Sequence, residues 1–250
     1  MIEIAGSDGV RVIAFDRPET RNAFNFAMYR EVSEAIEAAV AADDVRALVL
    51  TGRGSAFSAG QDLGEMARVA SGEANDGVAG GFPALMDALL GCPKPILAAV
   101  NGVGVGLGLT LLAHCDVVLI DETARLRAPF AELGVPPEAA SSYLLPARLG
   151  WQQAARVLLC AEWISAKEAV DAGIALRACA EGTVLDETIE VARRLAGYAP
   201  EAVREIKRLM RAPERSAVDA ALLRENDAFS RLLGSAANQQ ALRSFATRRR

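Results

Sequence analysis

Short apolar runs, separated by turn signals, follow one another along the chain as far as Ile120. Each has the length of a strand and an aliphatic or β-branched bias, and the four clearest are Val10–Phe15, Ala47–Leu50, Pro95–Val100 and Val117–Ile120. Between the first two runs, Phe26–Ala42 repeats its apolar positions at helical spacing. Strands that alternate with helices predict an α/β domain with largely buried strands.

Helical periodicity dominates after about residue 150. The segments that show it are Trp151–Cys160, Ala166–Ala172, Val184–Tyr198, Glu201–Arg211 and Ser216–Leu233. By contrast, in Glu65–Pro83 the stretch Met66–Ala70 fits one or two helical turns, but Ser71–Gly77 and Gly80-Gly81 are rich in glycine and small polar residues, which predicts a long loop. A long loop inside a compact domain is either mobile padding or a lid over a site, and the sequence leaves both open.

Composition and charge narrow the function classes. The chain has 250 residues, of which 52% are hydrophobic, and its formal net charge is −5. Proteins that bind nucleic acid usually carry a broad basic surface, so nucleic acid is not an expected partner, and Arg248-Arg249-Arg250 is expected to be a solvated tail. The four cysteines form no C-x-x-C pair, so neither a disulfide framework nor a zinc site is predicted.

Targeting signals are not apparent in the sequence. The first residues form neither the charged-then-apolar pattern of a signal peptide nor the Arg-rich pattern of a transit peptide. No apolar run reaches membrane-spanning length, and the C-terminus is not of the Ser-Lys-Leu type that directs proteins to peroxisomes. We therefore expect a cytoplasmic protein with no membrane partner.

Glycine occupies every second position from Gly102 to Gly108, between two apolar runs. Such glycines let backbone approach a ligand closely, and free N–H groups at a helix start favour a negatively charged atom. The spacing excludes a dinucleotide-binding G-x-G-x-x-G, because Leu107 or Leu109 stands where the third glycine is needed. The run indicates either an anion or oxyanion site made of backbone amides, or glycines that serve tight packing.

A second segment of small residues, Phe57–Leu63, follows the predicted strand Ala47–Leu50. Taken alone, it is either an ordinary loop or a flat backbone surface for a ligand. A serine nucleophile is not predicted, because Ala56 replaces the glycine of a nucleophile elbow and the only histidine, His114, lies in an apolar segment typical of core or helix surface. Together with the glycine run, this segment can supply two N–H donors to one oxygen.

Four linked motifs resemble the crotonase superfamily of enoyl-CoA hydratases and isomerases. They are Phe15-Asp16-Arg17-Pro18 with Arg21-Asn22-Ala23, then Phe57–Leu63, then Lys94–Gly102, and then Cys115-Asp116. Their order, their spacing and the total length match, so the resemblance covers nearly the whole chain.

The resemblance implies an α/β fold, a crotonase-like spiral of ββα units. It implies a core over residues 1–195 that holds a CoA thioester, and a helical C-terminal region over residues 196–250 that trimerises the protein and covers the active site. The expected assembly is a homotrimer or a dimer of trimers. The expected partner is an acyl-CoA thioester, and neither a metal nor another cofactor is expected, because CoA is part of the substrate.

The resemblance also implies an oxyanion hole formed by the backbone amides of Gln61 and Leu107. The residues expected to contact the CoA thioester are Arg21, Ser58, Ala59, Gly60, Gln61, Asp62, Leu63, Gly106 and Leu107. Arg17 or Arg21 is expected to meet the CoA phosphates, and Glu65–Pro83 to wall the acyl chain.

Two departures from the hydratase pattern bear on the reaction. Enoyl-CoA hydratases activate water with two glutamates, whose positions here hold Thr110 and Phe130, and neither residue is a general base at neutral pH. Glu138 instead lies in a Pro-Glu-x-x-Ser-Ser stretch similar to that of the Δ3,Δ2-enoyl-CoA isomerase branch, where the glutamate is the base. Without the resemblance, an acid in a helix's first turn explains Glu138 as well. Glu132 is expected to be structural or to lie at a subunit contact.

The resemblance therefore favours an isomerase that moves a double bond from 3-enoyl-CoA to 2-enoyl-CoA, with Glu138 as the base. Two alternatives stay open. One is a non-catalytic acyl-CoA-binding protein, and the other is a different enolate reaction, namely weak hydration, ring-opening isomerisation or thioester hydrolysis. Burial in an apolar pocket would raise the pKa of Glu138 and a helix start would lower it, and the sequence leaves that balance open.

Overall fold

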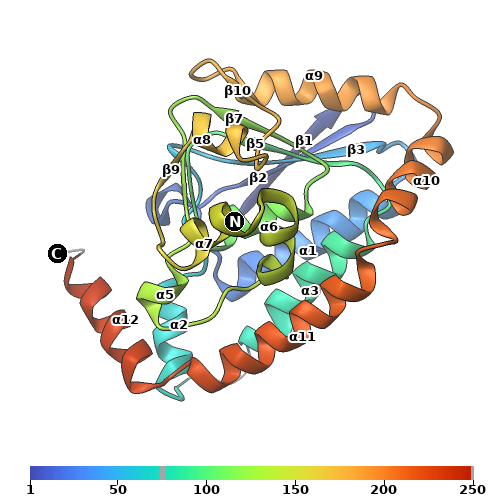
Figure 1. The fold of residues 1–250 in the computed structure, drawn as a ribbon. Coiled ribbons are helices and arrows are strands. Elements are labelled where there is room, and N and C mark those ends of the chain that lie inside the picture. Colours follow the sequence, from blue (N-terminus) through green and yellow to red (C-terminus); the bar gives the residue numbers. More distant parts are fainter. Residues whose placement is uncertain (74–76, 249–250) are drawn as a thin grey trace.

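A six-stranded sheet forms the framework of the molecule (Figure 1). The computed structural model describes residues 1–73 and 77–248, and the strands of this sheet are, in order, β1 (Ile2–Ser7), β2 (Val10–Phe15), β3 (Ala47–Gly52), β5 (Ile96–Val100), β7 (Val117–Asp121) and β10 (Arg177–Cys179). β1 and β2 form an antiparallel hairpin, and the other neighbouring strands are parallel. The four strands predicted from the apolar runs all lie in this sheet.

A second sheet has four short strands, which are β4 (Ala56–Ser58), β6 (Val103–Val105), β8 (Arg125–Arg127) and β9 (Ile164–Ser165). β4 follows β3 along the chain, β6 follows β5, and β8 follows β7, so the chain steps repeatedly from one sheet to the other. The helices that complete these turns are α2 (Leu63–Ala70), α3 (Gly77–Gly91), α4 (Leu107–Thr110) and α5 (Phe130–Leu133). The chain winds as a spiral of ββα units, and the predicted fold class is confirmed.

Side chains on β3 alternate between the two faces of the main sheet. Leu48 and Leu50 join the larger hydrophobic cluster with residues of α1 (Phe26–Ala41) and α3. Ala47 and Val49 join a smaller cluster with residues of α9 (Val184–Ala196). Figure 1 shows α9 on one side of the sheet and α1 and α3 on the other. Since full burial of one leucine side chain stabilises the fold by about 1.5–3 kcal/mol, these two clusters hold the strands in place.

The helical turns over Met66–Ala70 lie in α2, but the chain is helical again from Gly77 onward, so the prediction of a loop there was wrong. α2 ends at Ala70 and α3 begins at Gly77, and residues 74–76 lie outside the described part of the chain. Leu85 and Leu89 of α3 are fully buried, and a Cβ atom at Gly81 would lie 2.8 Å from the Cβ atom of Tyr29 on α1. Close packing against α1 therefore stabilises a helix that its glycines disfavour locally.

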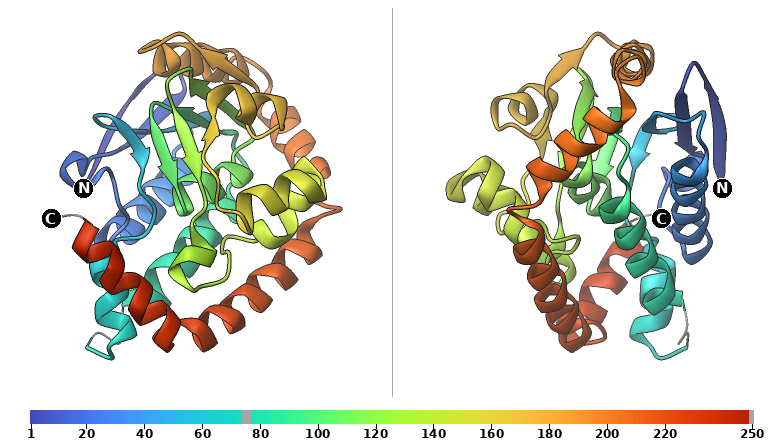
Figure 2. Two further views of the ribbon diagram at one scale, coloured as in Figure 1. Left: turned by 60° about the vertical axis from the view of Figure 1, so that its left-hand side comes forward. Right: turned by 90° about the vertical axis from the view of Figure 1, so that its right-hand side faces the viewer.

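Helices form most of the chain after β8. They are α6 (Ser141–Leu149), α7 (Trp151–Leu158), α8 (Ala166–Asp171), α9, α10 (Pro200–Arg211), α11 (Arg215–Leu232) and α12 (Ala236–Arg248). The five helices predicted there are present, whereas α6 and α12 were not predicted, and the expected boundary after residue 195 falls at the end of α9. α11 and α12 meet at an angle along the lower edge of the molecule (Figures 1 and 2). In the part of the chain that the structure describes, none of the helices has the length and apolar character needed to cross a bilayer.

Candidate active site

Two cavities meet at Glu138. The smaller, of about 320 Å³, is lined by Arg21, by residues at the ends of β4 and β6, and by apolar side chains of α2 and α5. The larger, of about 370 Å³, is lined mainly by residues of α1, α3 and α11. Gln61, Glu138 and Phe229 line both cavities, so a ligand at their junction would lie beside the Glu138 carboxyl group.

Glycines bring the two backbone segments singled out by the sequence into contact. Gly60 has a φ of +82°, and a Cβ atom there would lie 2.5 Å from a carbonyl oxygen of β6 and 3.3 Å from the amide nitrogen of Leu107. A Cβ atom at Gly108 would lie 2.3 Å from the carbonyl oxygen of Ser58. The glycines therefore do serve tight packing. That same packing places Gln61 and Leu107 at one cavity.

The backbone amides of Gln61 and Leu107 have no acceptor within the described part of the protein. Amides near Gln61 in the sequence do form hydrogen bonds. The Ala59 amide donates to the Arg21 carbonyl and the Asp62 amide to the Phe24 carbonyl, each at 2.8 Å. Backbone donors at a buried position are almost always paired. Both free amides are thus available to an oxygen atom in the cavity, as an oxyanion hole requires.

The carboxyl group of Glu138 is half-buried in the wall between the cavities. Thr110 donates a hydrogen bond from Oγ1 to Oε1 of Glu138 at 3.1 Å. Burial raises the pKa of Glu138 to about 8, the bond from Thr110 lowers it, and the negative charge of Glu225 raises it. Burial dominates, which resolves the balance that the sequence left open, and a pKa near the working pH suits a general base.

Glu138 precedes α6 and does not lie in its first turn. α6 begins at Ser141, and the two intervening residues, Ala139 and Ala140, have left-handed backbone conformations with φ of 59° and 54°. This conformation costs an alanine about 1–2 kcal/mol. The explanation of Glu138 as an acid placed in a helix's first turn is therefore wrong.

The residues expected to contact the thioester divide into two groups. Seven of the nine line the smaller cavity, namely Arg21, Ala59, Gly60, Gln61, Leu63, Gly106 and Leu107. Ser58 is fully buried, accepts a hydrogen bond from the Gly60 amide at 3.1 Å and donates to the Asn22 carbonyl at 2.8 Å. Asp62 caps α2 by accepting from the Gly64 amide at 3.0 Å. Ser58 and Asp62 therefore hold the backbone of this wall in place.

The arginines expected near CoA phosphates have different surroundings. Arg17 is largely buried, donates to the Ala23 carbonyl at 2.5 Å and pairs with Asp62 at 3.4 Å. Arg21 is exposed and lines the smaller cavity, so it is the one available to a ligand. Glu132 forms an ion pair with Arg127 of the same chain.

Aromatic side chains without any sequence signal of function line the larger cavity. They are Phe26, Tyr29, Phe82 and Phe229. Tyr29 lies on α1, whose apolar spacing indicates only core packing, and burial together with the charges of Glu138 and Glu65 raises its pKa well above the usual value. Phe229 comes from α11, and no local pattern could connect it with the site.

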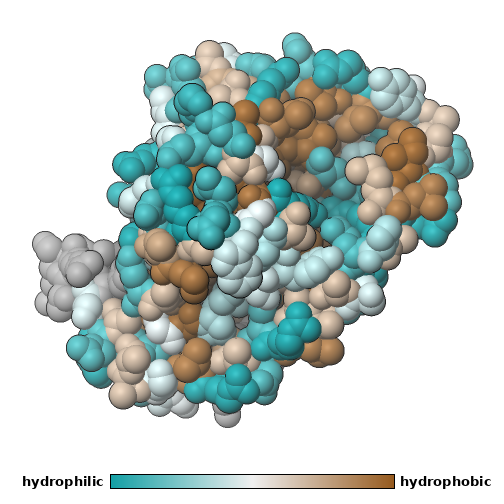
Figure 3. Space-filling model, viewed as in Figure 1, coloured by the Kyte–Doolittle hydropathy of each residue, from teal (hydrophilic) through white to brown (hydrophobic). Residues whose placement is uncertain are grey.

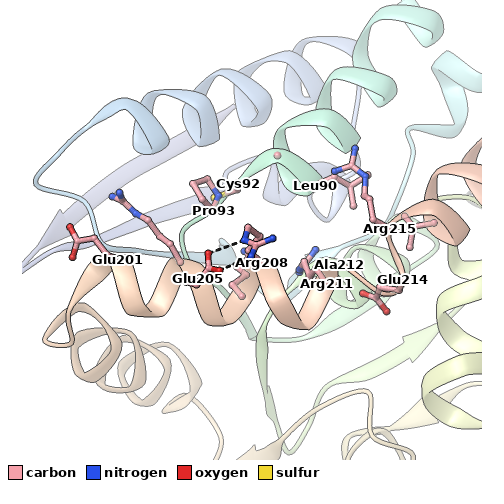
Figure 4. Close-up of a pocket in the computed structure, with 14 residues that line it drawn as sticks. Leu90, Cys92, Pro93, Glu201, Glu205, Arg208, Arg211, Ala212, Glu214 and Arg215 are labelled. Carbon is pink, nitrogen blue, oxygen red and sulfur yellow. Dashed lines mark hydrogen bonds and ion pairs between the residues drawn. The ribbon is translucent and has the colours of Figure 1, made fainter.

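A separate hollow of about 490 Å³ lies between the end of α3 and helices α10 and α11 (Figure 4). Its walls are charged, and several of the charges are paired, as Glu205 is with Arg208 at 2.6 Å and Arg211 with Asp116 at 3.1 Å. Across residues 1–73 and 77–248, no group of three or more His, Cys, Asp or Glu side chains is arranged to hold a metal ion. The candidate active site is the junction at Glu138, because a carboxyl group and two free backbone amides meet there.

Comparisons with known proteins point to one family. Residues 5–250 match the family model described as enoyl-CoA hydratase/isomerase. The chain is 31% identical over 245 residues to 1,2-epoxyphenylacetyl-CoA isomerase of Escherichia coli (strain K12), covering 96% of this chain and 93% of that protein. It is 33% identical over 221 residues to enoyl-CoA delta isomerase 2 of Homo sapiens, covering 87% of this chain and 56% of that protein. The solved structure of Pseudomonas aeruginosa OdaA superposes with a TM-score of 0.92 at 38% identity and covers 98% of both chains.

Proposed function

The chain belongs to the enoyl-CoA hydratase/isomerase family of the crotonase superfamily, and we propose that it is an isomerase that moves a double bond from 3-enoyl-CoA to 2-enoyl-CoA. One observation carries this proposal. Among the described carboxyl groups, that of Glu138 is the one that lines both cavities, beside a wall with two free backbone amides. This arrangement supplies one base and one site for a negatively charged oxygen.

The proposed reaction is a proton shuttle. Glu138 removes a proton from C2 of the 3-enoyl-CoA, and the electron pair moves onto the thioester oxygen to form a dienolate. The amides of Gln61 and Leu107 donate to this oxygen, and loss of one such donor typically costs about 3–4 kcal/mol of barrier. The dienolate then takes a proton at C4 from the Glu138 carboxyl group, which restores the carboxylate and gives the 2-enoyl-CoA. Substrate and product have the same atoms and oxidation state, so the reaction needs no co-reactant.

The raised pKa of Glu138 supports both halves of this shuttle. A carboxylate whose conjugate acid has a pKa of about 8 is a stronger base than an ordinary glutamate. After it takes the C2 proton, the same group is a carboxylic acid in a largely apolar wall and can donate to C4. One carboxyl group therefore serves as base and acid in turn.

The two hydratase positions support isomerisation over hydration. Thr110 stands at one of these positions and donates a hydrogen bond to Glu138. It carries a hydroxyl where a hydratase carries a carboxylate that activates water. Phe130 is a buried apolar residue in the wall of the smaller cavity. A second base for water is therefore absent from both positions.

The two cavities suggest how the substrate lies. The smaller cavity has the exposed Arg21 in its lining, and this cation suits the phosphate-bearing CoA arm. The lining of the larger cavity includes four aromatic side chains, which suit an acyl group. In this orientation the thioester would lie at the shared boundary, next to Glu138 and Gln61.

Ring-opening isomerisation of an epoxide formed on the ring of an aromatic acyl-CoA is the second candidate reaction. Its support is the cluster of four aromatic side chains around the larger cavity, because aromatic rings pack favourably against one another. The similarity to 1,2-epoxyphenylacetyl-CoA isomerase points in the same direction. This reaction would use the same base and the same pair of amides.

Product analysis separates the candidate reactions. The protein is incubated in parallel with a 3-enoyl-CoA, a 2-enoyl-CoA and 1,2-epoxyphenylacetyl-CoA, and the products are identified by mass spectrometry and chromatography. The proposal predicts conversion of 3-enoyl-CoA to 2-enoyl-CoA with unchanged mass. Faster addition of water to the 2-enoyl-CoA, or release of free CoA, would contradict it. Tight binding of all three without conversion would identify a non-catalytic acyl-CoA-binding protein.

We also propose that the protein assembles as a homotrimer or a dimer of trimers. Large apolar side chains are exposed along α10, namely Ile206, Leu209 and Met210. Figure 3 shows hydrophobic surface gathered around α9 and α10. An exposed apolar patch of this kind is typical of a subunit contact. Native mass spectrometry should give three or six subunits, and a stable monomer would contradict the proposal.

A further inference from the structure

The turn that carries Glu138 has a backbone conformation that its own residues disfavour. Ala139 and Ala140 are fully buried, and both have left-handed dihedral angles. Alanine seldom adopts this conformation, so two in succession persist only where the surrounding structure imposes it. The contacts that impose it also determine where the Glu138 side chain points.

Two buried side chains from other elements hold this turn through its backbone. Glu225 of α11 accepts hydrogen bonds from the Ala140 amide at 2.7 Å and from the Ser142 amide at 2.8 Å, one on each carboxylate oxygen. The Nε2 atom of His114 lies 2.7 Å from the carbonyl oxygen of Ala139. Burial lowers the pKa of His114 to about 4, so the ring is neutral near pH 7, and its Nε2 carries the proton that this bond requires.

Glu225 supplies the cap that α6 lacks. The residue before a helix usually accepts from first-turn amides through a side-chain oxygen, but that residue is Ala140 here. The carboxylate of Glu225 accepts from the amides instead, and the N-terminal end of α6 favours its negative charge. Only 5% of Glu225 is exposed, so a buried acid from the C-terminal part of the chain is bonded directly to the turn.

We propose that Glu225 is a positioning residue, which fixes the Ala139–Ala140 turn and so aims the Glu138 carboxyl group at C2 and C4 of the thioester. This inference rests on the proposed function of Glu138 as the base. Three groups face Glu138 from different helices, namely the hydroxyl of Thr110 on α4, the phenol of Tyr29 on α1 and the carboxylate of Glu225 on α11. Of these, Glu225 is the one that is bonded to the turn, so its removal alters both the direction and the titration of Glu138.

The variant Glu225→Gln keeps the size of the side chain but loses its charge and one acceptor. We expect kcat for 3-enoyl-CoA to fall about 10- to 100-fold, as for a small misplacement of a reacting group, while KM changes less than about 3-fold. The acid limb of kcat/KM should move to lower pH, because a negative charge beside Glu138 is removed. Asp227→Asn, on the exposed side of the same helix, is the matched control and should leave kcat, KM and the acid limb unchanged.

Amide hydrogen exchange gives a second readout that does not depend on turnover. In folded Glu225→Gln, the amides of Ala140 and Ser142 should exchange faster than in the wild type. Unchanged exchange would overturn the proposal, and so would faster exchange with an unchanged kcat and acid limb. If the wild-type protein itself fails to isomerise 3-enoyl-CoA, the proposed function fails, and the exchange rates still decide whether Glu225 holds the turn.

Discussion

Replacing Glu138 with a residue that does not ionise should stabilise the folded protein, although the same substitution removes the proposed base. Glu138→Gln preserves the size of the side chain and an oxygen that can accept the hydrogen bond from Thr110. At high pH the wild-type carboxyl group is an anion and its burial costs free energy. The amide of glutamine never ionises, so the variant does not have this cost. The variant therefore separates the cost of burying this acid from every other feature of the site.

The magnitude follows from the shift in pKa. The pKa of Glu138 is raised from an ordinary value of 4.5 to about 8 in the folded protein. Its contribution to stability is therefore complete below pH 4.5 and is lost as the pH rises to about 8, at about 1.4 kcal/mol per pH unit. At pH 7 the loss is about 3 kcal/mol, and this is an upper bound because Glu138 is only half-buried. Glu138→Gln should be more stable than the wild type by up to this amount at pH 7 and equally stable near pH 4.5.

Guanidinium-induced unfolding at pH 5, 6, 7 and 8 measures this difference, with both proteins at one concentration. Glu37→Gln, which changes an exposed glutamate on α1, is the control and should show no such pH-dependent gain. The free-energy difference between Glu138→Gln and the wild type should grow steadily from pH 5 to pH 8. A difference that stays constant over this range would refute the assigned pKa and, with it, the electrostatic account of the site.

Three further predictions concern catalysis and binding. The kcat/KM for 3-enoyl-CoA should rise about tenfold per pH unit below pH 8 and level off above it, and a flat profile from pH 6 to 9 would contradict the role of Glu138. Thr110→Val should move this rise to higher pH, because it removes a hydrogen bond that lowers the pKa of Glu138 in the wild type. Leu107→Pro removes one oxyanion donor at the first position of α4, where proline is tolerated, so kcat/KM should fall about 10²- to 10³-fold. The control Leu107→Met keeps the amide, and its kcat/KM should stay within a few-fold of the wild-type value. Arg21→Ala should raise KM for the thioester with kcat unchanged, and the exposed Arg53→Ala should change neither, so a loss in kcat alone would argue against Arg21 as a CoA contact.

Four of the six strands of the main sheet could be predicted from the sequence, whereas β1, β10 and the second sheet could not. Strands such as β3 are apolar on both faces, because hydrophobic clusters cover both sides, and this produces a continuous apolar run. β4, β6 and β8 have three residues each, too few to show a period, and they form only because neighbouring turns of the spiral pair with them. The helix α3 was missed for the same reason, since packing against α1 outweighs its local glycines.

The motif residues at the site could also be predicted, because short stretches of chain carry them. Gln61, Leu107 and Glu138 each stand in a recognisable segment, and the structure brings all three to one cavity. Tyr29 and Glu225 could not be found in this way, because one lies among core positions of α1 and the other comes from α11. The pKa of Glu138 was equally out of reach, because it depends on how deeply distant elements bury one carboxyl group.

The role of Glu138 as the base is tested by the kcat/KM of Glu138→Gln for 3-enoyl-CoA, measured beside its affinity for a saturated acyl-CoA. The account predicts a loss of about 10²- to 10⁴-fold in kcat/KM, the usual contribution of a general base, with the dissociation constant changed by no more than a few-fold. A variant that forms the 2-enoyl-CoA product within about fivefold of the wild-type rate would contradict the assignment of Glu138 as the base.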